Sequence, residues 1–167
     1  MSKIGIYYGS TGGVNEGIAN KIAQKLGVAG SDVHNIANYD ENEFKSYDLL
    51  LLGSSTWGDG DLQDDWFDPI DKIKALDLKG KKVALFSNGD SAGYTDTFCG
   101  ALKFLYEATT AAGAQVLEGV STDGYEVGAS EGVKDGKFLG LAIDEDNESD
   151  KTDERIDAWV EKVKAFL

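Results

Sequence analysis

Apolar residues in the first part of the chain change from a short continuous run to helical spacing. The run Ile4-Gly5-Ile6-Tyr7-Tyr8 stops at Gly9, and a small, polar loop follows it over residues 10–15. Apolar residues then recur three and four positions apart, at Ile18, Ala19, Ile22, Ala23 and Leu26. This spacing is typical of one face of a helix. The pattern therefore predicts a strand, a tight loop and a helix over residues 3–26.

The same alternation continues to the end of the chain. The pattern predicts strands at 31–36, 48–53, 82–86 and 115–120, the last interrupted by a Gly-rich polar segment at 121–137 and resumed at 138–143. Between them it predicts helices at 39–47, 66–76 and 98–108, with Pro69 in the first turn of the second, and a closing helix capped by Thr152. The run 48–53 is apolar throughout, as expected of a central strand that is covered on both faces.

Strands that alternate with helices predict a parallel sheet with helices on both faces, a three-layer α/β/α arrangement. No repeat or linker interrupts the 167 residues, so we expect one domain over 1–167. In such folds the ligand lies beyond the carboxyl ends of the strands. The loops at 9–15, 54–65 and 87–96 leave those ends, and we expect them to converge.

The first of these loops has the chemistry of an anion site. A loop that ends where a helix begins presents unpaired N–H groups and the positive end of the helix dipole. A nucleotide-binding Walker loop would need Lys after Gly13, where Val14 stands, and the glycine order does not fit a dinucleotide fingerprint. Two interpretations remain at this point: a phosphate held by hydroxyl and N–H groups without a cation, or an ordinary glycine-rich turn.

Charge narrows the classes of partner. The formal net charge is −14, which argues against binding to nucleic acid and favours binding to proteins with basic surfaces.

Single residues and short runs exclude further features. The chain has one cysteine, Cys99, so it cannot form an internal disulfide, which suits the cytoplasm. We expect a packed thiol at Cys99. No apolar run reaches membrane-spanning length. The first predicted strand begins within the first few residues, so we expect no signal peptide. We expect His34 on the surface and no metal site.

Two aromatic residues stand in polar surroundings in the other loops. Trp57 lies among small and acidic residues in the second loop, and Tyr94 lies among glycines and polar residues in the third. Each alone could be an aromatic residue that pins its loop to the core. Together, beside one phosphate loop, they could form the two sides of a slot for a flat ring.

These residues resemble the flavodoxins, specifically the long-chain type, over nearly the whole chain. The resemblance rests on Ser10–Asn15, Ser55-Thr56-Trp57-Gly58, Leu62–Trp66, Asn88-Gly89-Asp90 with Gly93-Tyr94, Ser121–Tyr125, Leu141–Asn147 and Thr152–Val160. It implies a flavodoxin-like, doubly wound five-stranded parallel sheet of order 2-1-3-4-5. It also implies a low-potential electron carrier, not an enzyme, which binds FMN non-covalently and works as a monomer. Its implied partners are basic-faced redox proteins, namely flavodoxin or ferredoxin reductases and oxidoreductases that use ferredoxin-type carriers.

The resemblance also implies a role for individual residues. The FMN phosphate would be wrapped by Ser10, Thr11, Gly12, Gly13, Val14 and Asn15. The isoalloxazine would be flanked by Trp57 and Tyr94, and the ring would be bordered by Ser55, Thr56, Gly58, Asp59, Asn88, Gly89, Asp90 and Asp96. Asp144 or Asp146 would approach the ribityl and phosphate side. Gly12 and Asn15 depart from the family's usual hydroxyl residues, so the phosphate contacts at these two positions stay open.

Two features of the loops would tune the flavin. The Gly58 carbonyl could accept a hydrogen bond from flavin N5–H once the one-electron semiquinone forms, because glycine lets its peptide turn at little cost. Acidic residues crowd both ring loops, at Asp59, Asp61, Asp64, Asp65, Asp90 and Asp96. Their charge would lower the potential of the second one-electron step by on the order of 100 mV.

Two other functions share this architecture. An FMN-dependent reductase of quinones or similar substrates would need a substrate pocket over the flavin, on the face that Tyr94 would cover. A response-regulator-like domain would need an acidic cluster after the first strand, where Gly9-Ser10-Thr11 stands instead.

Overall fold

The computed structural model describes residues 3–57 and 60–167 and is built on a parallel sheet. Its strands are β1 (Ile4–Gly9), β2 (Val33–Asn35), β3 (Leu49–Trp57), β5 (Lys82–Asn88), β6 (Gln115–Val116) and β9 (Leu141–Ile143). Their order is β2-β1-β3-β5-β6, and β9 also pairs with β5, further along it than β6 does. The predicted order 2-1-3-4-5 is confirmed, with β6 and β9 sharing the fifth position.

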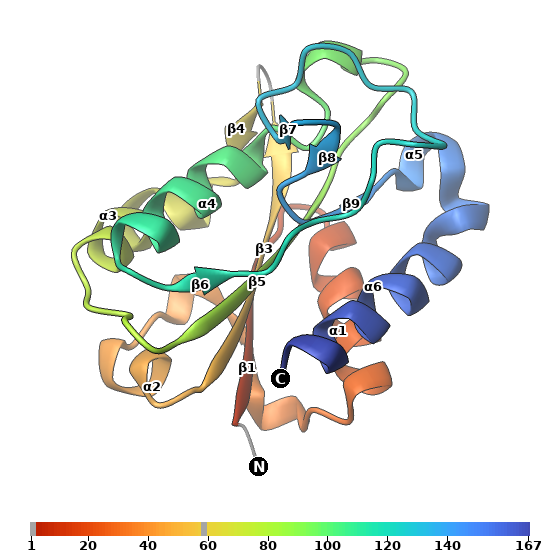
Figure 1. Cartoon of the computed structure of the whole chain (residues 1–167). Helices are drawn as coiled ribbons and strands as arrows, with labels where there is room; N and C mark the ends of the chain where they lie inside the picture. Colours follow the sequence, from red (N-terminus) through yellow and green to blue (C-terminus); the bar gives the residue numbers. More distant parts are fainter. Residues whose placement is uncertain (1–2, 58–59) are drawn as a thin grey trace.

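Helices cover both faces of this sheet (Figure 1). α1 (Val14–Leu26) and α6 (Thr152–Phe166) lie on one face, and α3 (Phe67–Lys74) and α4 (Ala101–Ala111) lie on the other. Two helices are short, α2 (Glu41–Lys45) and α5 (Glu145–Glu148). Single 3₁₀ turns occur at Gly30–Asp32, Ile36–Asn38, Asp64–Trp66, Thr95–Thr97 and Ser149–Lys151. The predicted three-layer arrangement is confirmed.

The central strands bury side chains on both faces because a separate core lies on each side. Leu50, Leu52 and Leu85 pack with α3 and α4, whereas Leu49, Leu51 and Phe86 pack with α1 and α6. Alternate residues of one strand thus enter opposite cores. This explains why the run 48–53 is apolar throughout, without the alternation of a half-exposed strand.

The second loop is shorter than the sequence pattern predicts. β3 continues to Trp57 and pairs in antiparallel fashion with β4 (Asp61–Leu62). Ser54 and Ser55 are buried in this extension, and the Ser87 hydroxyl donates to the Ser54 carbonyl at 2.7 Å. Hydroxyl side chains bonded between strands can occupy a buried strand that hydropathy alone does not reveal.

Several element boundaries also differ from the predicted ones. α4 begins at Ala101, after a 3₁₀ turn, and the strand expected at 115–120 is regular only at β6. The segment 121–137 separates β6 from β9 as expected, and a small hairpin of β7 (Val133–Lys134) and β8 (Lys137–Phe138) closes it. Thr152 is the first residue of α6, and its N-cap is Lys151.

The sequence also predicts the burial of two single residues, Cys99 and His34. Cys99 is fully buried, as predicted. The surface position predicted for His34 is wrong, because its side chain is only 15% exposed and stacks on Tyr7 with 4.7 Å between ring centroids. Its Nε2 also lies 2.8 Å from the Tyr47 hydroxyl. Contact with two aromatic residues therefore largely buries this imidazole, although it lies on a short edge strand.

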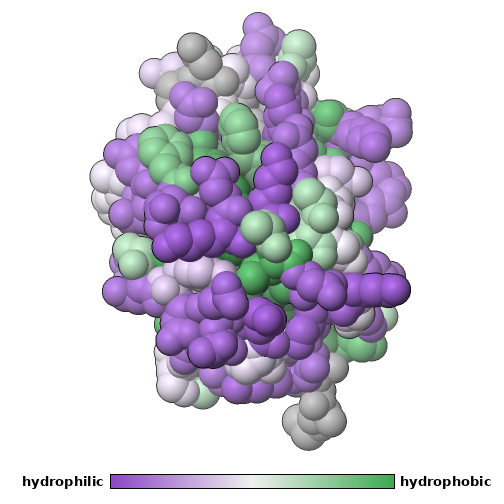
Figure 2. Space-filling model, turned by 90° about the vertical axis from the view of Figure 1, so that its left-hand side faces the viewer, coloured by the Kyte–Doolittle hydropathy of each residue, from purple (hydrophilic) through white to green (hydrophobic). Residues whose placement is uncertain are grey.

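The outer surface over α3 and α4 is mainly hydrophilic. Figure 2 looks onto this side and shows small apolar patches separated by polar and charged residues. Within residues 3–57 and 60–167, no helix has both the length and the apolar character needed to cross a membrane.

Candidate functional site

The three loops predicted to converge do so around one pocket of about 270 Å³ at the carboxyl ends of the strands. Its lining consists of Thr11, Val14, Ser55, Thr56, Trp57, Asn88, Gly89, Asp90, Tyr94, Thr97, Phe98 and Asp146. Thr97 and Phe98 were not among the predicted site residues, since the apolar Phe98 reads as the start of a core helix. The pocket joins a helix N-terminus to two exposed aromatic side chains.

The first loop has the geometry of an anion site. Gly12 and Gly13 have φ values of 83° and 90°, which side-chain-bearing residues rarely adopt, and α1 begins directly after them. Among the described residues, no side chain caps the first turn of α1. The Ser10 hydroxyl is buried and has no hydrogen-bond partner among those residues. The loop thus offers backbone N–H groups and a hydroxyl to a ligand.

Asn15 connects this loop to the strands that carry the rest of the pocket. It is fully buried, and its Nδ2 donates to Asn88 Oδ1 at 3.0 Å. The Ser55 hydroxyl donates to the same oxygen at 3.4 Å. The Oδ1 atom of Asn15 has no donor among the described residues. Asn15 therefore lies beneath the loop, where it ties α1 to β5.

The two aromatic residues are the most exposed large side chains of the pocket lining. Trp57 is 48% exposed and Tyr94 is 57% exposed. Trp57 ends β3, where it pairs with Asp61 of β4, and the adjacent pair is Thr56 with Leu62. Backbone pairing therefore sets the position of Trp57. Gly58 and Asp59, also predicted at the site, lie outside the described residues.

Hydrogen bonds to Asp90 shape the loop that carries Tyr94. Asp90 Oδ1 accepts from the Ala92 and Gly93 N–H groups at 3.1 and 2.9 Å, and the Tyr94 N–H donates to the Asp90 carbonyl at 2.9 Å. The Gly93 N–H and the Asn147 amide are the main causes that lower the pKa of Asp90 below its ordinary value. Bonds to the ionised carboxylate thus stabilise the turn.

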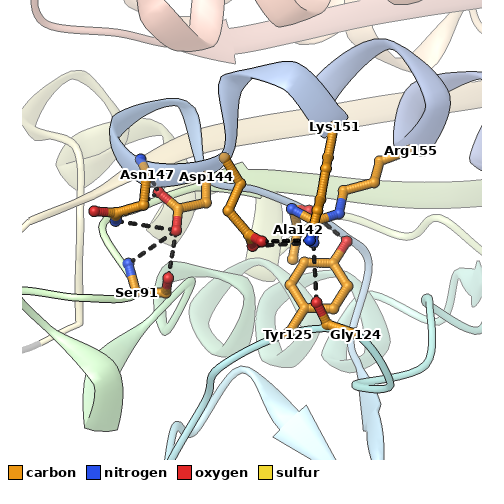
Figure 3. Close-up of polar contacts among 9 residues, drawn as sticks. Ser91, Gly124, Tyr125, Ala142, Asp144, Asn147, Lys151 and Arg155 are labelled. Atoms are coloured by element: carbon orange, nitrogen blue, oxygen red, sulfur yellow. Dashed lines mark hydrogen bonds and ion pairs between the residues drawn. The ribbon is translucent and has the colours of Figure 1, made fainter.

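Asp144 and Asp146 occupy different places. Asp144 is fully buried and accepts from Ser91 and Asn147, as Figure 3 shows, and it does not line the pocket. Asp146 is exposed and lines the pocket. Desolvation, followed by the charges of Asp90 and Asp144, raises the pKa of Asp146. Only Asp146 of this pair can face a ligand in the pocket.

Asp96 lies at the edge of the same loop. It is exposed and outside the pocket lining, and its Oδ1 accepts from the Ala129 N–H of the 121–137 segment at 3.3 Å. Its carboxylate therefore contributes charge near the pocket without facing into it.

Comparison with known proteins agrees with this geometry. The model of the flavodoxin family matches residues 6–159. The chain is 43% identical to Flavodoxin 1 of Azotobacter vinelandii over 164 residues, with 96% of this chain and 94% of that protein covered. It is 40% identical to a flavodoxin of Synechococcus elongatus, with 99% and 98% covered.

Solved structures show the same fold. A Fusobacterium nucleatum flavodoxin bound to flavin mononucleotide superimposes with a TM-score of 0.91 at 30% identity, covering 100% of this chain and 99% of that one. Its K13G mutant, also bound to flavin mononucleotide, gives 0.92, with 100% and 98% covered. The family model and these relatives span almost all of the chain, which therefore belongs to the flavodoxin family.

Proposed function

We propose that this chain is a low-potential electron carrier that binds FMN non-covalently and moves one electron at a time between redox proteins. The observation that carries the proposal is the single pocket that joins an anion-binding loop to Trp57 and Tyr94. FMN has this composition, a phosphate at one end and a flat ring at the other. We also propose that residues 1–167 form one FMN-binding domain.

The first loop fits the phosphate end of FMN. The buried Ser10 hydroxyl lacks a partner among the described residues, and the first turn of α1 lacks a side-chain cap there. A phosphate satisfies such donors and gains from the helix dipole. Thr11, Gly12, Gly13 and Val14 complete the loop around it, while Asn15 supports the loop from below.

The second and third loops fit the ring end. Trp57 and Tyr94 would stack on the two faces of the isoalloxazine and exclude water from it. Ser55, Thr56, Asn88, Gly89 and Asp90 border the pocket between them and would meet the ring edge. The roles proposed for Gly58 and Asp59 extend this set to residues outside the described part of the chain.

The bound flavin supplies the electron chemistry, and the protein tunes it. Asp61, Asp64, Asp65, Asp90 and Asp96 place negative charge on the two ring loops, which opposes a further negative charge in the pocket. A reductase of small substrates is not favoured, because Tyr94 would cover the flavin face that a substrate needs, and the chain belongs to a family of electron carriers.

The surface charge points to the kind of partner. A net charge of −14 favours redox proteins with basic surfaces, such as flavodoxin or ferredoxin reductases, and steers their approach at low ionic strength. We further propose that the protein works as a monomer in the cytoplasm.

A reductive titration tests the proposed function. The purified protein, reconstituted with FMN, should be yellow and should show a long-wavelength absorption band at half reduction that disappears on full reduction. Separate one-electron steps would support a carrier. An apoprotein that leaves the fluorescence of added FMN unchanged would overturn the proposal, and steady turnover of a quinone without a partner protein would favour the reductase.

A further inference from the structure

A buried carboxylate lies behind the Tyr94 loop. Asp144, the N-cap of α5, is fully buried, and the donors to its oxygens come from Ser91 and Asn147. Asn147 donates through its backbone N–H at 3.1 Å and its side-chain amide at 3.0 Å. Ser91 donates through its hydroxyl and, at 3.4 Å, through its backbone N–H. Figure 3 shows these contacts between α5 and the loop.

This arrangement favours one position of the loop. A buried charge is strongly destabilising unless hydrogen bonds satisfy it. Asn147 belongs to α5 itself, so its bonds form wherever the loop lies. The bonds from Ser91 form only when the loop packs against α5. The carboxylate of Asp144 therefore selects the packed loop over a detached one.

A short hydrogen-bonded turn connects the part of the loop that contacts α5 to Tyr94. Asn147 Nδ2 also donates to Asp90 Oδ1 at 2.8 Å, so both Asp90 and Ser91 are held by α5. The same Asp90 oxygen accepts from the Gly93 N–H, and the Asp90 carbonyl accepts from the Tyr94 N–H. Gly93 and Tyr94 are thus hydrogen-bonded to Asp90, which Asn147 of α5 holds in place.

α5 is itself fastened to the rest of the molecule. Glu148, its last residue, pairs with Arg155 of α6 at 3.1 Å and with Lys151 at 2.7 Å. The Arg155 guanidinium lies 3.9 Å from the centre of the Tyr125 ring, and its side chain is only 11% exposed. These contacts bind α5, which holds the Tyr94 loop, to α6 and to the segment that carries Tyr125.

We propose that Asp144 is a positioning residue, which holds Tyr94 over the flavin through Ser91 and does not itself bind FMN. The inference rests on the proposed function, since it concerns how that cofactor is held. Two observations carry it: Asp144 is absent from the pocket lining, and its bonds to the loop come from Ser91 alone.

The test is a double-mutant cycle of Ser91→Ala and Asp144→Asn, read by titrating each apoprotein with FMN. Ser91→Ala should weaken FMN binding about 10-fold, which equals about 1.4 kcal/mol. It should also raise the residual fluorescence of bound flavin, because a less constrained Tyr94 quenches less. Asp144→Asn should do the same, and in its background Ser91→Ala should have less than a third of its effect, since the two act through one contact.

Ser121→Ala is the matched control. Ser121 is exposed, and among the residues that the structure describes its hydroxyl oxygen accepts only from the Asp123 N–H. Its loss should therefore leave FMN binding and flavin fluorescence unchanged. A Ser91→Ala protein that matches this control, or effects of Ser91→Ala and Asp144→Asn that simply add, would overturn the inference. If the unmutated apoprotein does not bind FMN, the proposed function fails and the inference fails with it.

Discussion

The two aromatic walls of the pocket are held by different kinds of structure. Trp57 ends a central strand, and backbone pairing of β3 with β4 places it. Tyr94 lies in a loop whose shape depends on side chains, chiefly Asp90, Ser91, Asp144 and Asn147. One wall is thus part of the sheet, and the other is held by side-chain contacts with α5.

This difference predicts different sensitivities. A backbone ladder survives most side-chain changes, because its donors and acceptors belong to the main chain. A side-chain network loses its function when one carboxylate or hydroxyl is removed, since the remaining buried groups are then unsatisfied. A substitution near the pocket should therefore displace Tyr94 without moving Trp57 far more often than it displaces Trp57 without moving Tyr94.

The largest effect should come from removing either wall. Trp57→Ala and Tyr94→Ala should each weaken FMN binding up to about 100-fold, or about 2.7 kcal/mol, because each removes most of one stacking surface. Titration of the apoproteins with FMN measures this. Phe67→Ala is the control, since Phe67 is 56% exposed and does not line the pocket. Equal binding by all three variants would show that the ring is held elsewhere.

The next effect concerns charge on the two walls. Asp61, Asp64 and Asp65 lie on the Trp57 side, and Asp90 and Asp96 lie on the Tyr94 side. A carboxylate at about 10 Å disfavours an added negative charge by about 0.8 kcal/mol at an effective dielectric of about 40. Neutralising the Trp57-side set should therefore raise the second one-electron potential by on the order of 100 mV.

Neutralising the Tyr94-side set tests the comparison further. It should raise the same potential by a smaller electrostatic amount, but Asp90→Asn should also loosen the turn and so weaken FMN binding. Added salt should reduce the charge effect on both sides and leave the loosening unchanged. Identical salt dependence of both sets, in potential and in binding, would remove the distinction between the walls.

The fold was accessible from the sequence because the central strands have an unmistakable pattern. Residues 48–53 and 82–86 are apolar runs, and helical spacing follows each. Hydropathy does not predict the extension of β3 to Trp57, because Ser54 and Ser55 are polar residues that are nevertheless buried and Thr56 is partly buried. Ser87 on β5 hydrogen-bonds to both Ser54 and Thr56. The hydropathy of a segment does not show which groups of a neighbouring strand will hydrogen-bond to it.

The site was accessible in part for the same reason. The loop glycines and the two isolated aromatic residues stand out locally, and the structure brings them to one pocket. The different places of Asp144 and Asp146 could not be predicted, because one residue between them separates a fully buried carboxylate from an exposed one. Asp144 is satisfied by Asn147 nearby and by Ser91, and the contact with Ser91, far away in sequence, cannot be inferred from the local pattern.

A smaller effect should follow from removing the side chain of Gln63, which comes directly after β4 and hydrogen-bonds to the first loop. Gln63 is 2% exposed, and its Nε2 donates to the Thr11 hydroxyl at 3.0 Å. Gln63→Ala should lower the free energy of unfolding by about 1–2 kcal/mol and weaken FMN binding by less than about 10-fold. The exposed Gln24→Ala is the control. Bound-flavin fluorescence should not change, because Trp57 is placed by the backbone.

The smallest effect is a pH dependence that should distinguish the walls without mutation. The pKa of Asp90 is lowered from its ordinary value of 3.8, so its contribution to the Tyr94 turn is fully present above that value. It is lost as pH falls through the lowered pKa of the folded state. The pKa of Asp146 is raised from 3.8, so protonation of this residue favours the folded state as pH falls, with the opposite sign.

Bound-flavin fluorescence, followed from about pH 5 to well below 3.8 together with far-ultraviolet circular dichroism, measures this dependence. Fluorescence should rise before the helices unfold, because the turn around Asp90 loosens while the β3–β4 ladder, which has no titrating group in its backbone, still holds Trp57. Asp90→Asn should show the loosened signal already at neutral pH, and Asp146→Asn should make the acid transition steeper by removing the opposing contribution. A fluorescence signal that changes only with global unfolding would mean that the Tyr94 turn is held as firmly as the Trp57 strand.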